Sequence, residues 1–249
     1  MPGCVQVLQG VTTSQVCARW LSITEVALLE AGAAQSSSRS DRSGQATDAA
    51  TVRACSVRLA ALPELFDEVR EALQRHSALM ARLTAALGPS RTLLIDQCWV
   101  RHQPAPSQRA SGQTPHSWHQ DGALAFDFAS SPPGPAAPLP MLTCWLPLTD
   151  CGTDAPSLAW VDAPLDHLLM PDGLLDAAVH ARCAAAQPPL QLCHAVLPAG
   201  DALLFDGGLL HRTHATAAMT RARTSVELRW MPAEASALRL TGEQIAFVP

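Results

Sequence analysis

The stretch His116-Ser117-Trp118-His119-Gln120-Asp121-Gly122 places a histidine and an aspartate two positions apart. Side chains alternate between the faces of a β-strand, so on a strand His119 and Asp121 would point to the same side. Together they offer two ligands for a metal ion, and His211, at the end of the segment 203–211, is the best candidate for a third. Two histidines and one carboxylate on one face of an iron ion, with the other positions open, are typical of non-haem Fe(II) oxygenases.

The bulk composition indicates one soluble globular domain with a sizeable core. The chain has 249 residues, of which 48% are hydrophobic and 16% are charged, as is usual for a single β-rich domain of this length. The net charge of -5 argues against a nucleic-acid partner. All 17 basic residues are arginine, and the absence of lysine excludes Schiff-base chemistry, a pyridoxal phosphate anchor and a Walker A phosphate loop.

The eight cysteines are scattered and form no C-x-x-C pair. We therefore expect free, mostly buried thiols in a reducing compartment, with neither a disulfide framework nor a zinc ribbon. The chain begins without a basic segment followed by an apolar run, so no signal peptide is expected. No apolar stretch is long enough to span a bilayer, and the sequence predicts a cytoplasmic protein with no membrane partner.

The order of elements predicts a mainly β fold supported by helices near the N-terminus. We expect residues 1–55 to form a helix and then a flexible linker over 31–49, and residues 56–249 to form a single domain. Helical spacing of leucines marks 55–87, with a break at Pro63. Short strands separated by proline and glycine turns follow, which is typical of a jelly roll. Strands are expected at 93–100, 141–148, 158–161, 202–205 and 223–230, with a loop at 130–140 and an insertion at 164–186.

Three segments of the chain together resemble the phytanoyl-CoA dioxygenase family. They are Trp118-His119-Gln120-Asp121-Gly122, the segment 200–205 that leads to His211, and Arg223-Thr224-Ser225-Val226. An H-x-D motif alone is weak, but H-x-D, then a Gly-Asp strand, a distal histidine and a later arginine in this order are fairly specific. The resemblance covers roughly residues 90–230. It implies a double-stranded β-helix, the cupin-like jelly roll, and an enzyme that uses Fe(II), 2-oxoglutarate and O2.

The resemblance also assigns roles to individual residues. It implies that the three candidate ligands hold the iron and leave positions open for 2-oxoglutarate and O2. The far carboxylate of 2-oxoglutarate would pair with Arg223, since a guanidinium can bind a carboxylate through two bonds. Arg221 is the rival for this role, because the spacing differs slightly from that of the family. Thr213 would give a hydroxyl to the cosubstrate, and Gln97 would lie near it.

The retained carboxylate narrows the reaction that the resemblance implies. Related halogenases carry glycine or alanine in place of Asp121, so we expect hydroxylation of a small-molecule metabolite with succinate and CO2 as coproducts. Desaturation and ring closure stay open as variants. The family acts on acyl-CoA thioesters, amino acids and natural-product intermediates, and the chain lacks a basic cluster for a CoA phosphate. A small polar metabolite is therefore favoured, with selectivity in the loop 130–140 and the insertion 164–186.

Two other classes of protein remain as alternatives. One is a cupin-type oxygenase that does not use 2-oxoglutarate, and the presence of Arg223 argues against it. The other is a non-catalytic jelly-roll sensor that has kept a metal site. Glu227 and Arg229 share a strand face with Arg223, so Arg229 is open to an anionic substrate or to an ion pair with Glu227. His116 and His214 are out of phase with the ligands, and we expect neither to bind the metal.

Overall fold

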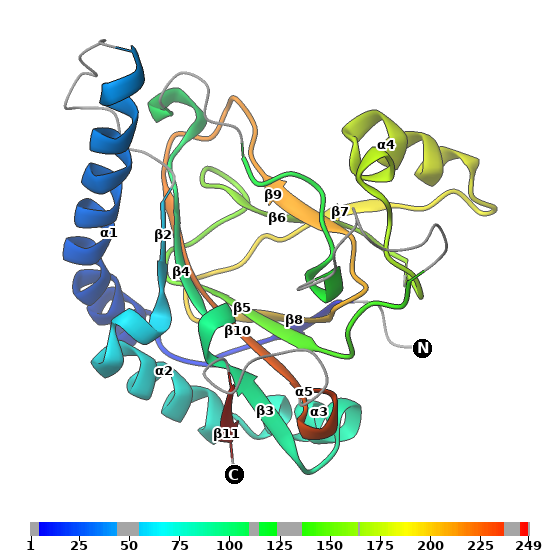
Figure 1. Ribbon diagram of the computed structural model, residues 1–249, viewed down its shortest axis with the longest axis horizontal. Helices are drawn as coiled ribbons and strands as arrows, with labels where there is room; N and C mark the ends of the chain where they lie inside the picture. The colour runs from blue at the N-terminus through cyan, green and yellow to red at the C-terminus, as the bar shows by residue number, and fades with distance from the viewer. Residues whose placement is uncertain are drawn as a thin grey trace.

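The computed structural model describes residues 5–43, 55–109, 115–123, 136–163, 165–236 and 245–248. Two antiparallel β-sheets face each other, and the helices α1, α2 and α3 lie outside the larger sheet (Figure 1). This arrangement confirms the predicted jelly roll with a helical layer near the N-terminus. Within the described part of the chain, no helix is long and apolar enough to cross a membrane.

The larger sheet has eight strands and is built around β10, Arg223–Pro232. Its main order is β1-β8-β5-β10-β3-β11, and β4 pairs with both β10 and β2. The smaller sheet has the order β7-β6-β9. The other strands are β1 Val5–Leu8, β2 Cys55–Arg58, β3 Arg91–Leu94, β4 Trp99–Gln103, β5 Leu142–Pro147, β6 Ser157–Val161, β7 Leu192–His194, β8 Ala202–Asp206, β9 His211–His214 and β11 Ile245–Val248.

Helices α2 and α3 bury leucine-rich faces against the outer side of the larger sheet. In α2, Pro63–Arg75, residues Leu65, Val69 and Leu73 are buried at a spacing of four, which places them on one helix face. His76 caps the next helix, because its Nδ1 accepts a hydrogen bond from the Leu79 amide at 3.2 Å. The remaining helices are α1 Ser14–Ser43, α3 Ser77–Leu87, α4 Asp176–Ala185 and α5 Ala233–Ser236.

Strand β10 separates the helix-side core from the space between the sheets. Val226, Leu228 and Trp230 belong to the core that the helices cover. The alternate residues Glu227 and Arg229 line a cavity on the opposite side. Since neighbouring side chains of a strand point to opposite faces, a ten-residue strand that is buried almost throughout carries a hydrophobic face and a polar, charged face at once.

Three expectations about the elements were wrong. The expected linker 31–49 is helical as far as Ser43, because α1 continues through small residues that do not break a helix; residues 44–49 lie outside the described residues. Residues 55–58 form β2 and pair with β4 instead of starting a helix. The expected strand 93–100 is divided by the 3-10 turn η2, Ile95–Gln97. In addition, residues 245–248 form β11, a strand that was not predicted, and pair with β3.

Candidate metal centre

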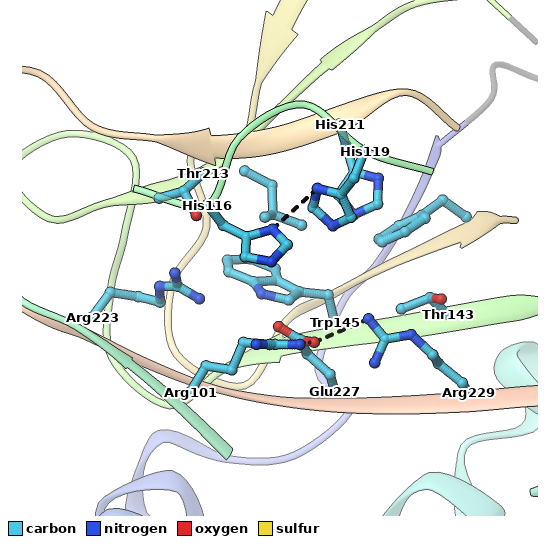
Figure 2. A pocket seen from close by; sticks show the side chains of 12 residues that line it. Arg101, His116, His119, Thr143, Trp145, His211, Thr213, Arg223, Glu227 and Arg229 are labelled. Carbon is cyan, nitrogen blue, oxygen red and sulfur yellow. Dashed lines mark hydrogen bonds and ion pairs between the residues drawn. The ribbon is translucent and has the colours of Figure 1, made fainter. Parts of the chain in front are cut away.

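The three candidate ligands meet at one point between the sheets. The Nε2 atom of His119 lies 3.9 Å from Oδ1 of Asp121, and Nε2 of His211 lies 4.0 Å from the same oxygen. One potential ligand atom of each residue falls within 4.8 Å of the others. Figure 2 shows the two imidazoles on the upper wall of the cavity, which the sequence placed ninety-two residues apart.

Backbone hydrogen bonds fix the two histidines opposite each other. The His119 amide donates to the His211 carbonyl at 2.9 Å, and the His211 amide donates back at 3.0 Å. This is an isolated bridge, after which the chain enters the 3-10 turn η4, Asp121–Ala123. The strand expected around His119 is therefore wrong. The tight turn still brings the Asp121 carboxylate to the histidines, because Gly122 packs where a Cβ would lie 2.7 Å from the Gly207 carbonyl oxygen.

The hydrogen bonds of the imidazoles leave both Nε2 atoms free to bind a metal. Nδ1 of His119 lies 2.7 Å from the Ser117 carbonyl, and Nδ1 of His211 lies 3.0 Å from the Leu209 carbonyl. A carbonyl only accepts, so each Nδ1 carries the proton and each Nε2 keeps its lone pair. Burial, together with the neighbouring His211, lowers the pKa of His119 to about 3. Neutral imidazoles are the form that coordinates a metal.

The Asp121 carboxylate is held by an arginine fork and a hydroxyl. Nε and Nη2 of Arg229 donate to its two oxygens, each at 3.0 Å. The Thr143 hydroxyl donates to Oδ2 at 2.6 Å. Burial alone would raise the pKa of Asp121, but Arg229 and the two neighbouring histidines together outweigh it and hold the pKa well below its usual range. The group is a carboxylate with a fixed orientation, with Oδ1 turned toward the histidines.

The same arginine continues into a chain of charges along the lower wall of the cavity. Oε2 of Glu227 accepts from Arg229 at 3.1 Å and from Arg101 at 2.8 Å, as Figure 2 shows. Burial would raise the pKa of Glu227, but these two arginines lower it to about 2. Of the two options for Arg229, the ion pair with Glu227 is present. Its stronger partner is Asp121, 108 residues away, and no local pattern pointed to that contact.

Arg223 is buried in the cavity wall without a carboxylate partner among the described residues. Its Nη1 donates to the Ser225 hydroxyl at 2.6 Å, and its guanidinium carbon lies 5.3 Å from the centre of the Trp145 ring. Its Nε has no hydrogen-bond partner. Burial lowers the pKa of Arg223 to about 10, so it stays a cation near neutral pH. Arg221 instead lies at the surface, 54% exposed, and pairs with Asp154 at 3.5 Å.

The other two expected site residues differ in their placement. Thr213 lies on β9 and lines the cavity, on the side where Figure 2 shows Arg223. Gln97 lies in η2, where its backbone carbonyl accepts a 2.8 Å hydrogen bond from Arg229. Its side chain is not among the groups that line the cavity: Arg101, His116, His119, Thr143, Trp145, Leu158, Phe205, His211, Thr213, Arg223, Glu227 and Arg229.

Two histidines that are close to the candidate ligands in the sequence, His116 and His214, are not part of the metal centre. Nδ1 of His116 lies 3.1 Å from Nδ1 of His119, on the side of the imidazole that faces away from Asp121. Burial lowers the pKa of His116 to about 4, so its ring is neutral near pH 7. The His214 ring stacks on His194 with their centroids 4.5 Å apart. Neither histidine belongs to the group of three potential ligands.

The insertion around α4 contacts the sequence neighbours of both candidate histidine ligands. Nε1 of Trp118 donates to Asp176 at 2.8 Å, and Arg212 forms an ion pair with the same carboxylate. Trp118 precedes His119 and Arg212 follows His211 in the chain. The insertion expected at 164–186 therefore packs directly beside the candidate metal centre, and it contains the 3-10 turn η5, Pro171–Leu174, as well as α4.

Comparison with known proteins identifies the family. The sequence model of the phytanoyl-CoA dioxygenase family (PhyH) matches residues 4–222. The chain belongs to this family. The match starts well before residue 90, where the resemblance in the motifs begins, so it includes the N-terminal helices. It ends just before Arg223, whose role therefore depends on the geometry described above. A search of curated proteins found no match.

Several solved structures share the fold of this phytanoyl-CoA dioxygenase family member. EctD from S. alaskensis with bound Fe has a TM-score of 0.62 and 16% identity, and the match covers 93% of this chain and 74% of EctD. The non-heme alpha ketoglutarate dependent carbocyclase SnoK from nogalamycin biosynthesis has a TM-score of 0.59 and 14% identity, with 99% and 92% covered. The epimerase SnoN, in complex with Fe3+, alpha ketoglutarate and nogalamycin RO, has a TM-score of 0.57 and 18% identity, with 93% and 80% covered.

Proposed function

We propose that this protein is an Fe(II)- and 2-oxoglutarate-dependent dioxygenase that hydroxylates a small-molecule metabolite and releases succinate and CO2. Membership of the phytanoyl-CoA dioxygenase family supports the class of reaction. The observation that carries the proposal is the pairing of a three-donor metal centre with Arg223, a buried cation that has no carboxylate partner among the described residues and lines the same cavity.

The donor set suits the metal that the proposal requires. Two imidazole nitrogens and one carboxylate oxygen are the ligands of the 2-His-1-carboxylate centre, which leaves positions open for other ligands. His119, Asp121 and His211 would hold Fe(II), which when bound with 2-oxoglutarate supplies the activation of O2. The Nδ1 contacts of both histidines and the fork from Arg229 orient these ligands in advance, and such outer contacts support metal affinity.

The cosubstrate would lie between the metal centre and β10. Arg223 would bind the far carboxylate of 2-oxoglutarate, because its Nε is buried without a partner and a guanidinium binds a carboxylate through two parallel bonds. The Thr213 hydroxyl would add a further contact from the opposite sheet. A buried cation that lacks a carboxylate partner among the described residues favours a ligand that brings one.

The choice of hydroxylation depends on Asp121. In the related halogenases the position of this carboxylate is taken by glycine or alanine, whereas here a carboxylate is present and fixed by Arg229 and Thr143. Two of the structurally similar proteins are described as an epimerase and a carbocyclase, so the fate of the substrate is the part of the proposal that a product assay must establish.

The test of the metal centre compares two histidines three residues apart. We expect His211→Ala to abolish Fe(II) binding in anaerobic equilibrium dialysis and to abolish succinate formation from 2-oxoglutarate. His214→Ala should retain both, because His214 stacks on His194 outside the centre. Unchanged iron affinity in the His211→Ala variant would contradict the assignment of the ligands, and succinate formation without iron would contradict the class of enzyme.

A further inference from the structure

The cavity carries an excess of positive charge in a chain that is acidic as a whole. Three arginines line it, Arg101, Arg223 and Arg229, together with the carboxylate of Glu227. The Asp121 carboxylate lies directly behind Arg229. Three cations against two anions leave one positive charge, whereas the whole chain has a net charge of -5. Fe(II) and the dianion 2-oxoglutarate cancel each other, so the excess persists in the loaded site.

Of the three cavity arginines, Arg101 is the one whose guanidinium keeps an edge open to a second anion. Arg229 is matched by Asp121 and Glu227, and Arg223 is the proposed partner of 2-oxoglutarate. Arg101 shares Oε2 of Glu227 with Arg229, so the two cations have one carboxylate oxygen between them. Its Nη1 donates to the Ser56 hydroxyl at 3.2 Å. Among the described residues Nη2 of Arg101 has no hydrogen-bond partner, and its side chain is 28% exposed, against 8% for Arg229.

The neighbours of Arg101 fix its position but leave part of its hydrogen-bonding capacity free. Its guanidinium carbon lies 5.3 Å from the centre of the Trp99 ring, a stacking contact that leaves the edge of the guanidinium available. Figure 2 shows it on the lower wall of the cavity beside Glu227, facing the wall that carries His116. A preoriented arginine of this kind loses little freedom when it binds an anion.

Arg101 and Arg223 are also far enough apart to serve two different anions. Strands β4 and β10 are antiparallel, and Arg101 pairs with Ser225 while Arg223 pairs with Gln103. The two arginines are therefore two positions apart along the sheet, roughly 7 Å at the usual rise of a strand. A ligand on Arg223 leaves the exposed edge of Arg101 accessible from the cavity.

We propose that Arg101 is a specificity-determining residue that binds an anionic group of the primary substrate, a carboxylate or a phosphate. This inference rests on the proposed function, because it assigns the substrate to the space that 2-oxoglutarate leaves. The open edge of the Arg101 guanidinium lies beside Glu227, whose charge Arg101 shares with Arg229. This edge attracts an anion and repels a cation. The local positive field would also draw anionic substrates into the cavity of an otherwise acidic protein.

The test uses two small anions on the loaded protein. The anaerobic Fe(II)·2-oxoglutarate complex is formed first and checked by its visible charge-transfer band. Acetate and methylphosphonate are then titrated separately by isothermal titration calorimetry at constant ionic strength, so the two arms distinguish a carboxylate from a phosphate. We expect at least one probe to bind with a stoichiometry of one, and Arg101→Gln to weaken it by about tenfold or more, as expected for the loss of a charged hydrogen bond.

The controls separate the possible failures. Arg221→Gln, at the surface, should leave probe binding unchanged. Because Arg101→Gln removes one of the cations that neutralise Glu227, a second measurement uses the unaltered protein: a bound probe should protect Arg101 from phenylglyoxal, read by peptide mass spectrometry. Absence of probe binding, unchanged binding in Arg101→Gln, or loss of the charge-transfer band in that variant would each overturn the inference. Absence of the band in the unaltered protein would instead overturn the proposed function.

Discussion

The two ends of β10 carry the same residue in opposite electrostatic situations. Arg223 and Arg229 lie six positions apart on one face of the strand, and both side chains are buried. Arg229 contacts two carboxylates, Asp121 and Glu227. Arg223 contacts the Ser225 hydroxyl and the Trp145 ring. The protein supplies carboxylate partners for the charge of Arg229, but for Arg223 it supplies one hydroxyl and an aromatic ring.

This difference indicates a structural role for Arg229 and a ligand-binding role for Arg223. Burial of a charge without a counter-ion is unfavourable, and the pKa values reflect it. For Arg229, burial lowers the pKa but the two carboxylates raise it above its ordinary value, whereas burial lowers that of Arg223 to about 10. An anionic ligand at Arg223 would therefore stabilise the fold, whereas an anionic ligand at Arg229 would not.

The largest effect is expected from Arg229→Ala. The substitution leaves Asp121 and Glu227 buried without their shared cation, so we expect a loss of about 3–5 kcal/mol in the free energy of unfolding. Fe(II) affinity should fall by about 10- to 100-fold, as for other outer contacts of metal ligands. Urea unfolding and anaerobic iron titration measure the two effects. A variant as stable as the unaltered protein would show that the ion pairs of Arg229 have no structural role.

A smaller and different effect is expected from Arg223→Gln. No carboxylate of the protein loses a partner, so the unfolding free energy should change little, and iron affinity should be retained. The KM for 2-oxoglutarate should rise by roughly 30- to 150-fold, the equivalent of about 2–3 kcal/mol for a charged hydrogen-bonded pair. Succinate formation at varied 2-oxoglutarate gives this value. An unchanged KM would contradict the proposal that Arg223 binds a ligand whereas Arg229 has a structural role.

The smallest effect is expected from Glu227→Gln, which should change the pH dependence of the free energy of unfolding. The pKa of Glu227 is lowered in the folded state to about 2, below its value in the unfolded chain. Its contribution is therefore complete above about pH 4.5 and is lost as the pH falls toward 2. Urea unfolding between pH 6 and pH 3 should show a weaker loss of stability in the variant. Equal slopes would indicate that Glu227 is not ion-paired in solution.

The contrast between local and distant contacts explains how far the sequence was informative. The alternation of β10 placed Arg223, Glu227 and Arg229 on one face, because a strand has a fixed period of two. His119 and Asp121 were also predicted as candidate ligands. The argument assumed a strand, whereas the structure has an isolated bridge followed by a 3-10 turn. The proximity of the two residues depends on the Gly122 turn and not on strand phase.

The contacts that sequence reasoning missed join segments far apart in the chain. The fork between Arg229 and Asp121 spans 108 residues and the pair of Arg101 with Glu227 spans 126, and periodicity carries no information over such separations. Helix α1 extends to Ser43 although its last part lacks large apolar residues, because a helix propagates easily once its first turns are packed. Strands β2 and β11 form because partners elsewhere complete them.

The most direct test of the account is the anaerobic charge-transfer band of the Fe(II)·2-oxoglutarate complex in the unaltered protein, Arg223→Ala and Arg221→Ala. We expect the band in the unaltered protein at low 2-oxoglutarate. Arg221→Ala should give the same titration, and Arg223→Ala should need a much higher concentration to reach the same intensity. Iron binding without a band in the unaltered protein, or identical titrations for all three proteins, would contradict a 2-oxoglutarate site built on Arg223.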